Sequence, residues 1–258
     1  MKNIKLVVTD LDGTLLKNDK TISAYTLEVL KECRNKGIKI GFATARPIRG
    51  VTTAKGYFEP DFLIAHNGAV VRIGEEEQVF GITREEFEPF LQTFLEKYPS
   101  SELGIEANDI FFANYDVTKY WPDENFMRTS GDFSEFAFKY ADKILISPTD
   151  GDFNEVRKWL PDSLYLEIAD QKVGMIMKKE ATKFNAIRSV AKIYGIPMEE
   201  TVAFGDDDND VLMIKGVGVG VAMENANEKV KAVSDEVTKS NESDGVALWL
   251  KKNVLEVE

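Results

Sequence analysis

The chain has 258 residues, of which 43% are hydrophobic and 29% are charged, and its formal net charge is −12. This acidic balance argues against general nucleic-acid binding, which needs lysine and arginine to neutralise phosphates. No stretch approaches the roughly 20 consecutive apolar residues of a membrane-spanning helix, and the single cysteine, Cys33, cannot form a disulfide within the chain. We therefore expect a cytoplasmic protein with neither a nucleic-acid partner nor a membrane partner.

Strand-like and helix-like runs alternate in the first part of the chain. Residues 4–8 form a short apolar, β-branched run that ends at an Asp-Gly turn signal. Ser23 can cap a following helix, and Gly37 stands just past its expected end. Two further strand-like runs cover residues 38–43 and 62–65. Strands that alternate with helices predict a doubly wound, mainly parallel α/β sheet.

The same alternation returns near the C-terminus. Thr182 can cap a helix that runs to about Tyr194, and a closing helix is expected over residues 244–252. Between them we expect a strand over residues 201–204, a short helix over residues 209–214 and a second strand over residues 217–221. These elements extend the sheet predicted for the first part of the chain.

The central part of the chain has a different pattern. Thr83 and Glu86 form a capping box, and large apolar residues then recur at helical spacing from Phe87 to Tyr98. Five shorter strand candidates follow, at residues 103–107, 110–114, 143–146, 164–168 and 173–177. We predict a core domain formed by residues 1–81 and 182–258, with an α+β domain inserted over residues 82–181.

Acidic side chains stand where two predicted strands end. Asp10 and Asp12 follow the first strand, and Asp206 follows the strand over residues 201–204. Open α/β sheets bind ligands beyond the carboxyl ends of their strands, and carboxylates are suitable oxygen ligands for Mg²⁺. Asp10 and Asp206 are therefore candidate ligands of one Mg²⁺ ion.

Other residues match the needs of phosphoryl transfer. A phosphoester repels an approaching carboxylate, so donors and cations must hold the phosphate oxygens. Thr44 offers a hydroxyl, Lys183 offers a positive charge, and the turn after Asp10 offers backbone N–H groups. Asp12 could protonate the leaving oxygen and later activate water.

Jointly, these motifs resemble the haloacid dehalogenase superfamily of phosphatases, in its Cof-type (class IIB) branch. The resemblance implies a Rossmann-like core with an inserted α+β cap of the C2B type, which closes over the substrate. The motifs that carry it are Asp10-Leu11-Asp12-Gly13-Thr14, Thr44-Ala45-Arg46, Lys183 and Gly205-Asp206-Asp207-Asp208-Asn209-Asp210. Two later stretches, 220–226 and 244–247, also resemble that branch.

The resemblance implies a role for each matching position. Asp10 would attack phosphorus and form an aspartyl-phosphate, while Asp12 would act first as general acid and then as general base. Mg²⁺ would be held by the carboxylates of Asp10 and Asp206 and by the backbone carbonyl of Asp12. The phosphate oxygens would be held by the Leu11 amide, Thr44, the Ala45 amide, Lys183 and Asn209, and Asp210 would orient a metal-bound water or Lys183.

The resemblance further implies hydrolysis of small phosphate monoesters such as sugar phosphates, with a small phosphorylated metabolite as partner. A phosphosugar mutase and a non-catalytic phosphate sensor on the same fold are the alternatives. Neither the physiological substrate nor the oligomeric state is indicated by the sequence. Tyr120, Trp121 and Arg128 lie in the insert and are candidates for contact with the leaving group.

Two positions depart from the family pattern. Ala45 and Glu224 stand where the family commonly has glycine. Ala45 keeps its backbone donor, but a left-handed conformation there would be strained because of the added methyl group. We expect Glu224 to alter only the rim of the site.

Three other interpretations of the motifs fail on spacing. An EF-hand calcium loop in the run 206–210 would need glycine at Val211 and glutamate at Val217. A cysteine phosphatase would need arginine six positions after Cys33, where Lys39 stands. The glycines of residues 216–220 lack the third glycine of a dinucleotide fingerprint, so we expect a close approach of strands there.

Three further residues have both a structural and a functional interpretation. His66, the only histidine, is expected to have a structural or rim role. Lys183 in isolation would be an exposed helix lysine, and only its place after the insert makes it a phosphate ligand. Arg46 is equally suited to contact substrate or to pair with an acid.

Overall fold

The computed structural model describes residues 3–119, 127–129, 133, 136–149, 152–169 and 173–256. The chain divides into two compact units. The first, which we call the core unit, comprises Met1–Gln78 and Thr182–Glu258. The second, the inserted unit, comprises Val79–Ala181. Within the described ranges, no helix combines the length and the apolar character that a membrane span requires.

The core unit is built on an eight-stranded sheet with the order β16-β15-β14-β1-β2-β3-β4-β5. The pairs from β16 to β3 are parallel, whereas β3 and β4 are antiparallel. The strands are β1 (Leu6–Thr9), β2 (Lys39–Ala43), β3 (Phe62–Ala65), β4 (Val70–Ile73), β5 (Glu76–Val79), β14 (Thr201–Gly205), β15 (Val219–Ala222) and β16 (Glu236–Val237). The sheet is thus mainly parallel, as predicted.

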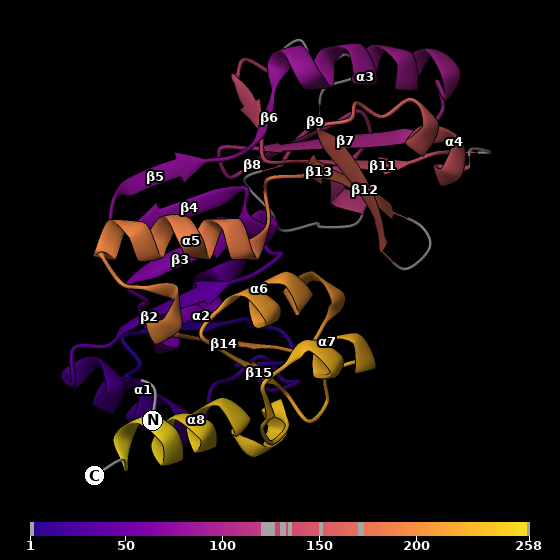
Figure 1. Cartoon of the computed structure of the whole chain (residues 1–258). Helices are drawn as coiled ribbons and strands as arrows, with labels where there is room; N and C mark the ends of the chain where they lie inside the picture. The colour runs from indigo at the N-terminus through magenta and orange to yellow at the C-terminus, as the bar shows by residue number, and fades with distance from the viewer. Residues whose placement is uncertain are drawn as a thin grey trace. The chain divides into compact units, whose positions relative to one another are not determined.

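Helices cover both faces of this sheet. Figure 1 shows α1 and α8 on one side of the core strands, with α5 and α6 on the other. The helices of the core unit are α1 (Ala24–Asn35), α2 (Thr52–Tyr57), α5 (Lys183–Tyr194), α6 (Val211–Gly216), α7 (Glu228–Val233) and α8 (Gly245–Leu250). This arrangement confirms the predicted doubly wound α/β class.

The two longest helices of the core begin and end where local chemistry predicts. The Ser23 hydroxyl accepts a hydrogen bond from the backbone N–H of Thr26 at 3.0 Å. At the start of α5, the Thr182 hydroxyl accepts one from the N–H of Asn185 at 3.1 Å. Such caps satisfy N–H groups that have no partner inside the helix. Gly195 follows α5 with a φ of 66°, a left-handed conformation that glycine adopts without strain.

Strands β4 and β5 were absent from the sequence prediction. Strand β5 has the sequence Glu-Glu-Gln-Val, and its first three residues are exposed. Such a polar run lacks the apolar alternation by which a half-buried strand is recognised. Its strand conformation follows from pairing at the edge of the sheet rather than from its own residues.

Gly218, just before β15, and Gly220, within it, allow a close backbone approach, but to a 3-10 turn and to α6 rather than to the strands that the sequence predicted. A Cβ atom at Gly218 would lie 2.4 Å from the carbonyl oxygen of Glu199. A Cβ atom at Gly220 would lie 2.0 Å from the carbonyl oxygen of Ile214. Both glycines are therefore needed for backbone packing, which excludes side chains at these positions.

The inserted unit is an α+β layer with its own apolar core. Its main sheet has the order β12-β13-β11-β7-β8-β9, and β10 and β6 form a separate pair. The elements are β6 (Ile82–Thr83), α3 (Arg84–Lys97), β7 (Glu102–Ala107), β8 (Ile110–Ala113), β9 (Met127–Thr129), β10 (Tyr140–Ala141), β11 (Lys143–Ser147), α4 (Phe153–Lys158), β12 (Leu164–Ala169) and β13 (Val173–Lys178). All five strands predicted for this part of the chain are present.

Helix α3 packs through the aromatic stripe predicted from its spacing. Its capping box forms as expected, because the Glu86 carboxylate accepts a hydrogen bond from the N–H of Thr83 at 2.8 Å. Phe87, Phe90 and Phe94 are buried in the core of the inserted unit. The stripe is therefore packing surface, as predicted.

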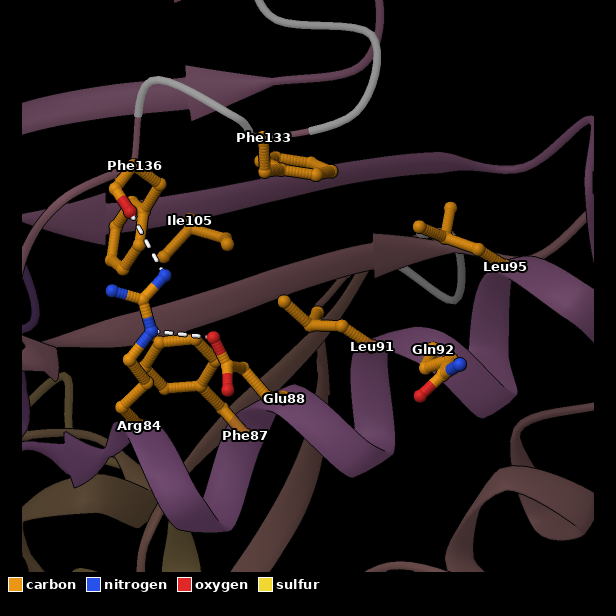
Figure 2. A pocket seen from close by; sticks show the side chains of 9 residues that line it. All are labelled: Arg84, Phe87, Glu88, Leu91, Gln92, Leu95, Ile105, Phe133 and Phe136. Atoms are coloured by element: carbon orange, nitrogen blue, oxygen red, sulfur yellow. Dashed lines mark hydrogen bonds and ion pairs between the residues drawn. The ribbon is translucent and has the colours of Figure 1, made fainter.

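A cavity of about 430 Å³ lies beside α3 within the inserted unit. Figure 2 shows Leu91 and Leu95 on α3 facing Ile105 and Phe133 across it. At one end, the Arg84 guanidinium donates a hydrogen bond to the carbonyl oxygen of Phe136 at 3.1 Å. The remaining lining residues are Phe87, Glu88 and Gln92. None of the residues predicted for catalysis lines this cavity.

Of the three candidates for leaving-group contact in the insert, Arg128 lies in β9. Tyr120 and Trp121 lie outside the described residues.

Burial of α3 yields a stability prediction. Phe94→Ala should lower the free energy of unfolding by about 3–5 kcal/mol, because it removes a fully buried aromatic side chain and leaves a cavity. Gln92→Ala, an exposed position on the same helix, should change it by less than about 0.5 kcal/mol. Urea unfolding followed by circular dichroism measures both. Equal losses in the two variants would contradict the packing described for α3.

Candidate active site

The predicted site residues converge at the carboxyl ends of the central strands. In the sheet order, β1 lies between β2 and β14. The chain leaves β1 toward β2 and β3, whereas it leaves β14 toward β15, in the opposite direction across the sheet. Open α/β sheets bind ligands at the point where the strand order reverses in this way, here between β1 and β14. The backbone N–H of Asp10 donates to the carbonyl oxygen of Phe204 at 3.0 Å, which extends the pairing beyond the strand ends. This register brings Asp10 and Asp206 to one edge of the sheet.

A buried lysine connects two of the acids. The Lys183 Nζ atom lies 2.6 Å from Asp10 Oδ1 and 2.7 Å from Asp210 Oδ1. The Lys183 side chain is only 1% exposed, so its interpretation as an exposed helix lysine is wrong. Lys183 is the first residue of α5, and the Thr182 cap fixes this helix end against the strand ends.

Asp210 accepts hydrogen bonds on both of its carboxylate oxygens. While Oδ1 accepts from Lys183, Oδ2 accepts from the backbone N–H groups of Asp206 at 2.9 Å and Asp207 at 3.1 Å. A Cβ atom at Gly205 would lie 2.5 Å from the Asp210 Cβ atom. Asp210 thus orients Lys183 and shapes the loop after β14, and glycine at 205 leaves room for it.

The Asp206 carboxylate is positioned by the first motif. Its Oδ1 atom accepts a hydrogen bond from the Thr14 hydroxyl at 2.5 Å. Gly13 adopts a φ of +75°, and a Cβ atom there would lie 2.2 Å from Asp206 Oδ2. The glycine of the Asp-Gly-Thr run is therefore required by its backbone conformation and by the space that the Asp206 carboxylate occupies.

The three acids form a cluster whose chemistry fits a hard divalent cation. Ligand atoms of Asp10, Asp206 and Asp210 lie within 4.8 Å of one another. Two of the three carboxylates, those of Asp10 and Asp210, bond to the Lys183 ammonium, so the cluster of three acids and one lysine holds more negative than positive charge when ionised. Because Asp210 already accepts on both oxygens, Asp10 and Asp206 are better placed to coordinate a cation. An all-oxygen donor set of this kind suits Mg²⁺.

The excess of acids is reflected in the pKa values of this cluster. Burial, reinforced by the charges of Asp210 and Asp206, raises the pKa of Asp10 to about 8 even though Lys183 opposes the change. Burial also raises the pKa of Asp206 to about 6. Burial opposes the charge on Lys183, but Asp10 and Asp210 outweigh it and raise the pKa of Lys183 above its usual value. A bound cation would favour the ionised form of both raised carboxyls.

The side chain of Asp12 is held by two cations. Its Oδ2 atom accepts from Arg46 Nε at 2.6 Å, and its Oδ1 atom accepts from Arg46 Nη2 at 2.5 Å. Oδ1 also accepts from Lys20 Nζ at 2.7 Å. Burial opposes the charge of this carboxylate, but the bonds from Arg46 and Lys20 outweigh it and lower the pKa of Asp12. Of the two roles open to Arg46, the structure shows the pairing with an acid.

Two further predicted residues meet at a turn after β3. Thr44 follows β2 directly and is buried, and its carbonyl oxygen accepts from the N–H of Asn67 at 3.0 Å. The Asn67 side-chain oxygen in turn accepts from Asn209 Nδ2 at 2.9 Å. Asn67 thus joins the turn after β3 to the loop that carries Asn209.

The turn at 66–68 has three successive residues with positive φ. The values are 49° at His66, 58° at Asn67 and 109° at Gly68. His66 is 1% exposed, in agreement with a structural role. The Asn-Gly pair is a turn signal, but nothing in the sequence indicated that Asn67 would contact Asn209. Sequence reasoning likewise assigned no role to Lys20.

Leu11 and Ala45 lie in the turns that follow β1 and β2. Leu11 is fully buried, and its carbonyl oxygen accepts from the N–H of Leu16 at 2.8 Å. Ala45 does not occur among the described non-glycine residues with positive φ. Its methyl group therefore does not introduce the left-handed strain considered above.

Comparison with known proteins identifies the family. The chain matches the haloacid dehalogenase-like hydrolases over residues 7–250. It belongs to this family. A Bacillus subtilis relative, the 5-amino-6-(5-phospho-D-ribitylamino)uracil phosphatase YitU, is 31% identical over 268 residues, which cover 96% of each chain.

Solved structures of this family superpose on nearly the whole chain. TM0651 from Thermotoga maritima has a TM-score of 0.84 at 26% identity, covering 96% of this chain and 97% of its own. The subclass IIB sugar phosphatase BT4131 has a TM-score of 0.80 at 28% identity, and the match covers 96% of this chain and 98% of the BT4131 chain. The chain is an enzyme of the phosphatase class with the haloacid dehalogenase fold.

The contact between Gly13 and Asp206 predicts a strong effect of a single methyl group. Gly13→Ala should abolish detectable turnover, because the new methyl displaces the Asp206 carboxylate as well as straining the backbone. Gly37→Ala is the matched control, since Gly37 has a φ of +83° but nothing lies within 4 Å of its added Cβ atom. The control should lose about 1–2 kcal/mol of stability and keep its activity. Initial rates with 4-nitrophenyl phosphate and thermal unfolding test both, and equal activities would contradict the role given to Gly13.

Proposed function

We propose that this phosphatase hydrolyses small phosphate monoesters in a Mg²⁺-dependent reaction, through an aspartyl-phosphate on Asp10. The observation that carries the proposal is the meeting of Asp10, Asp206 and Lys183 at the edge of the sheet where α/β folds bind ligands. The relatives act on small phosphorylated compounds, as the names of YitU and the sugar phosphatase BT4131 state. Phosphorylated sugars and related metabolites are therefore the proposed substrate class.

Three groups would hold the metal ion. They are the carboxylates of Asp10 and Asp206 and the backbone carbonyl of Asp12. When bound, Mg²⁺ would reduce the repulsion between the Asp10 carboxylate and the phosphate dianion and stabilise charge on the phosphate oxygens. Thr14 and Gly13 keep the Asp206 carboxylate in place for this role.

The phosphate would be held opposite Asp10 by donors from several elements. Lys183 supplies its ammonium, and Thr44 supplies its hydroxyl. The backbone N–H groups of Leu11 and Ala45 and the side chain of Asn209 complete the set. These donors are fixed by the sheet edge before substrate arrives, which favours stabilisation of the transition state. Asp210 positions Lys183 for this contact.

The reaction then proceeds in two displacements. Asp10 forms a bond to phosphorus as the ester oxygen leaves, and Asp12 gives that oxygen a proton. Asp12 next takes a proton from water, whose oxygen attacks phosphorus while the bond to Asp10 breaks. Phosphate is released and both carboxyl groups return to their starting state. We assign the choice of leaving group to the inserted unit.

Replacement of the nucleophile tests the mechanism. Asp10→Asn should lower turnover at least about 10³-fold, because a carboxamide does not form the phosphoenzyme. Asp208→Asn is the matched control, since Asp208 is exposed and pairs with Lys229, and it should keep wild-type activity. Inorganic phosphate is measured with a panel of sugar phosphates and Mg²⁺. Normal activity of Asp10→Asn would refute the nucleophile, and transfer of phosphate within the sugar without its release would indicate a mutase.

Binding of Mg²⁺ should depend on pH. Asp10 and Asp206 have raised pKa values of about 8 and about 6 in the fold, against about 4 in an unfolded chain. Without metal, their contribution to stability is complete below about pH 4 and is lost as the pH rises through these values. Mg²⁺ binds the ionised carboxylates and offsets that loss.

The rise in melting temperature on adding Mg²⁺ should therefore be larger at pH 8 than at pH 5. Treatment with EDTA should abolish turnover, and Mg²⁺ should restore it. The measurement is a thermal unfolding series with and without Mg²⁺, with Asp206→Asn as the variant expected to show little response. A Mg²⁺ effect of the same size at both pH values would contradict this assignment of ligands.

A further inference from the structure

The carboxylate of Asp12 accepts hydrogen bonds from two cationic side chains, those of Arg46 and Lys20. Arg46 binds it through two nitrogen atoms, one to each carboxylate oxygen. Lys20 adds a third bond, from Nζ to Oδ1 at 2.7 Å. Charge-assisted bonds that reach both oxygens restrict the rotation of a carboxylate as well as its position.

Arg46 is itself held by residues of the segments that follow β2 and β3. Its Nη1 atom donates to the carbonyl oxygen of Gly50 at 2.9 Å. Its backbone N–H donates to the Thr44 hydroxyl at 3.2 Å, and its carbonyl oxygen accepts from the N–H of His66 at 3.0 Å. Arg46, which binds Asp12, is thus hydrogen-bonded to the same turns that carry the phosphate-binding candidates.

Lys20 reaches Asp12 from a tight turn with an unusual backbone. The N–H of Lys17 donates to the carbonyl oxygen of Thr21 at 3.0 Å, and the N–H of Lys20 donates to that of Lys17 at 2.9 Å. Within this turn Lys20 adopts a φ of 65°, a left-handed conformation that is unfavourable for a lysine. Strain of this kind is concentrated at functional sites, where surrounding contacts maintain it.

Stability does not explain the pair between Lys20 and Asp12. The side chain of Lys20 is 52% exposed and that of Asp12 is 40% exposed. Ion pairs in such exposed positions contribute little to folding. The geometry of an acid–base group, by contrast, strongly affects the rate of proton transfer.

We propose that Lys20 is a positioning residue, which together with Arg46 fixes the ionised Asp12 carboxylate to take a proton from the attacking water. This inference rests on the proposed function, in which Asp12 serves as general acid and then as general base. It adds to that function a residue from the turn at 17–21. Lys20 touches the reacting atoms only through Asp12.

The two displacements depend on Asp12 to different degrees when the leaving group is a good one. In the first, the bond from phosphorus to the ester oxygen breaks as the bond to Asp10 forms, and 4-nitrophenolate leaves without needing a proton. In the second, Asp12 must take a proton from water as the new P–O bond forms and the bond to Asp10 breaks. Misplacement of Asp12 therefore slows the second step selectively with 4-nitrophenyl phosphate.

Rapid mixing of 4-nitrophenyl phosphate with Lys20→Met separates the two steps. We expect a burst of 4-nitrophenolate whose rate stays within about twofold of wild type. We expect the steady-state rate that follows to fall about tenfold or more, as for a lost bond to a charged group. Lys20→Arg, which retains a cation, should recover most of the steady-state rate.

Lys17→Met is the matched control. Lys17 belongs to the same turn but contacts Glu242 and Asp244, so this variant should match wild type in both phases.

The amplitude of the burst reports the fraction of folded, active enzyme, so poor folding would lower the amplitude without changing the ratio of the two rates. Wild-type behaviour of Lys20→Met, or an equal loss in both phases, would overturn the positioning role. Failure of the proposed function looks different, because wild-type enzyme would then form no phosphoenzyme, or Asp10→Asn would remain active.

Discussion

The buried ammonium of Lys183 is the contact around which the active end of the sheet is organised. It bonds to Asp10, 173 positions earlier in the chain, and to Asp210, 27 positions later. Two buried carboxylates without this cation would repel each other and lack compensation for their lost hydration. Removal of one partner from such a group is costly, so the contact fixes α5 relative to the loops after β1 and β14.

The same contact leaves the cluster incomplete in charge. The cluster holds three carboxylates and one ammonium, and burial raises the pKa of both Asp10 and Asp206. Either protonation of Asp10 and Asp206 or a bound cation can balance this charge, and the site is therefore suited to a cation without requiring one for folding. Stability and function are therefore linked through one set of side chains, and the topology of the sheet determines where they meet.

Around this centre, several residues adopt conformations that local stability does not favour. His66, Asn67 and Lys20 all have positive φ values. Asn67 contacts Asn209, and Lys20 contacts Asp12. For Asn67 and Lys20, a left-handed backbone conformation thus accompanies a contact between a polar side chain and a candidate site residue. Departures from local preference are expected at functional sites for this reason.

Much of this protein follows from patterns that span only a few residues. Caps at Ser23, Thr83 and Thr182 set the starts of three helices, because the bonds they form lie within one helical turn. Apolar runs followed by Asp10 and Asp206 indicated both the parallel strands and the acids at their ends. The alternation of these runs was sufficient for the fold class.

Three contacts were decided only by the tertiary structure. Arg46 pairs with the Asp12 carboxylate, and Lys20 binds the same carboxylate. The side chain of Asn67 accepts a hydrogen bond from Asn209. The tertiary structure also decided that β5, a polar run, becomes an edge strand. Except for the short-range pair of Lys20 and Asp12, these contacts join side chains from different strand ends, or a strand to its neighbour in the sheet. Such contacts depend on the register of the sheet and the packing of helices on it, which sequence spacing alone does not specify.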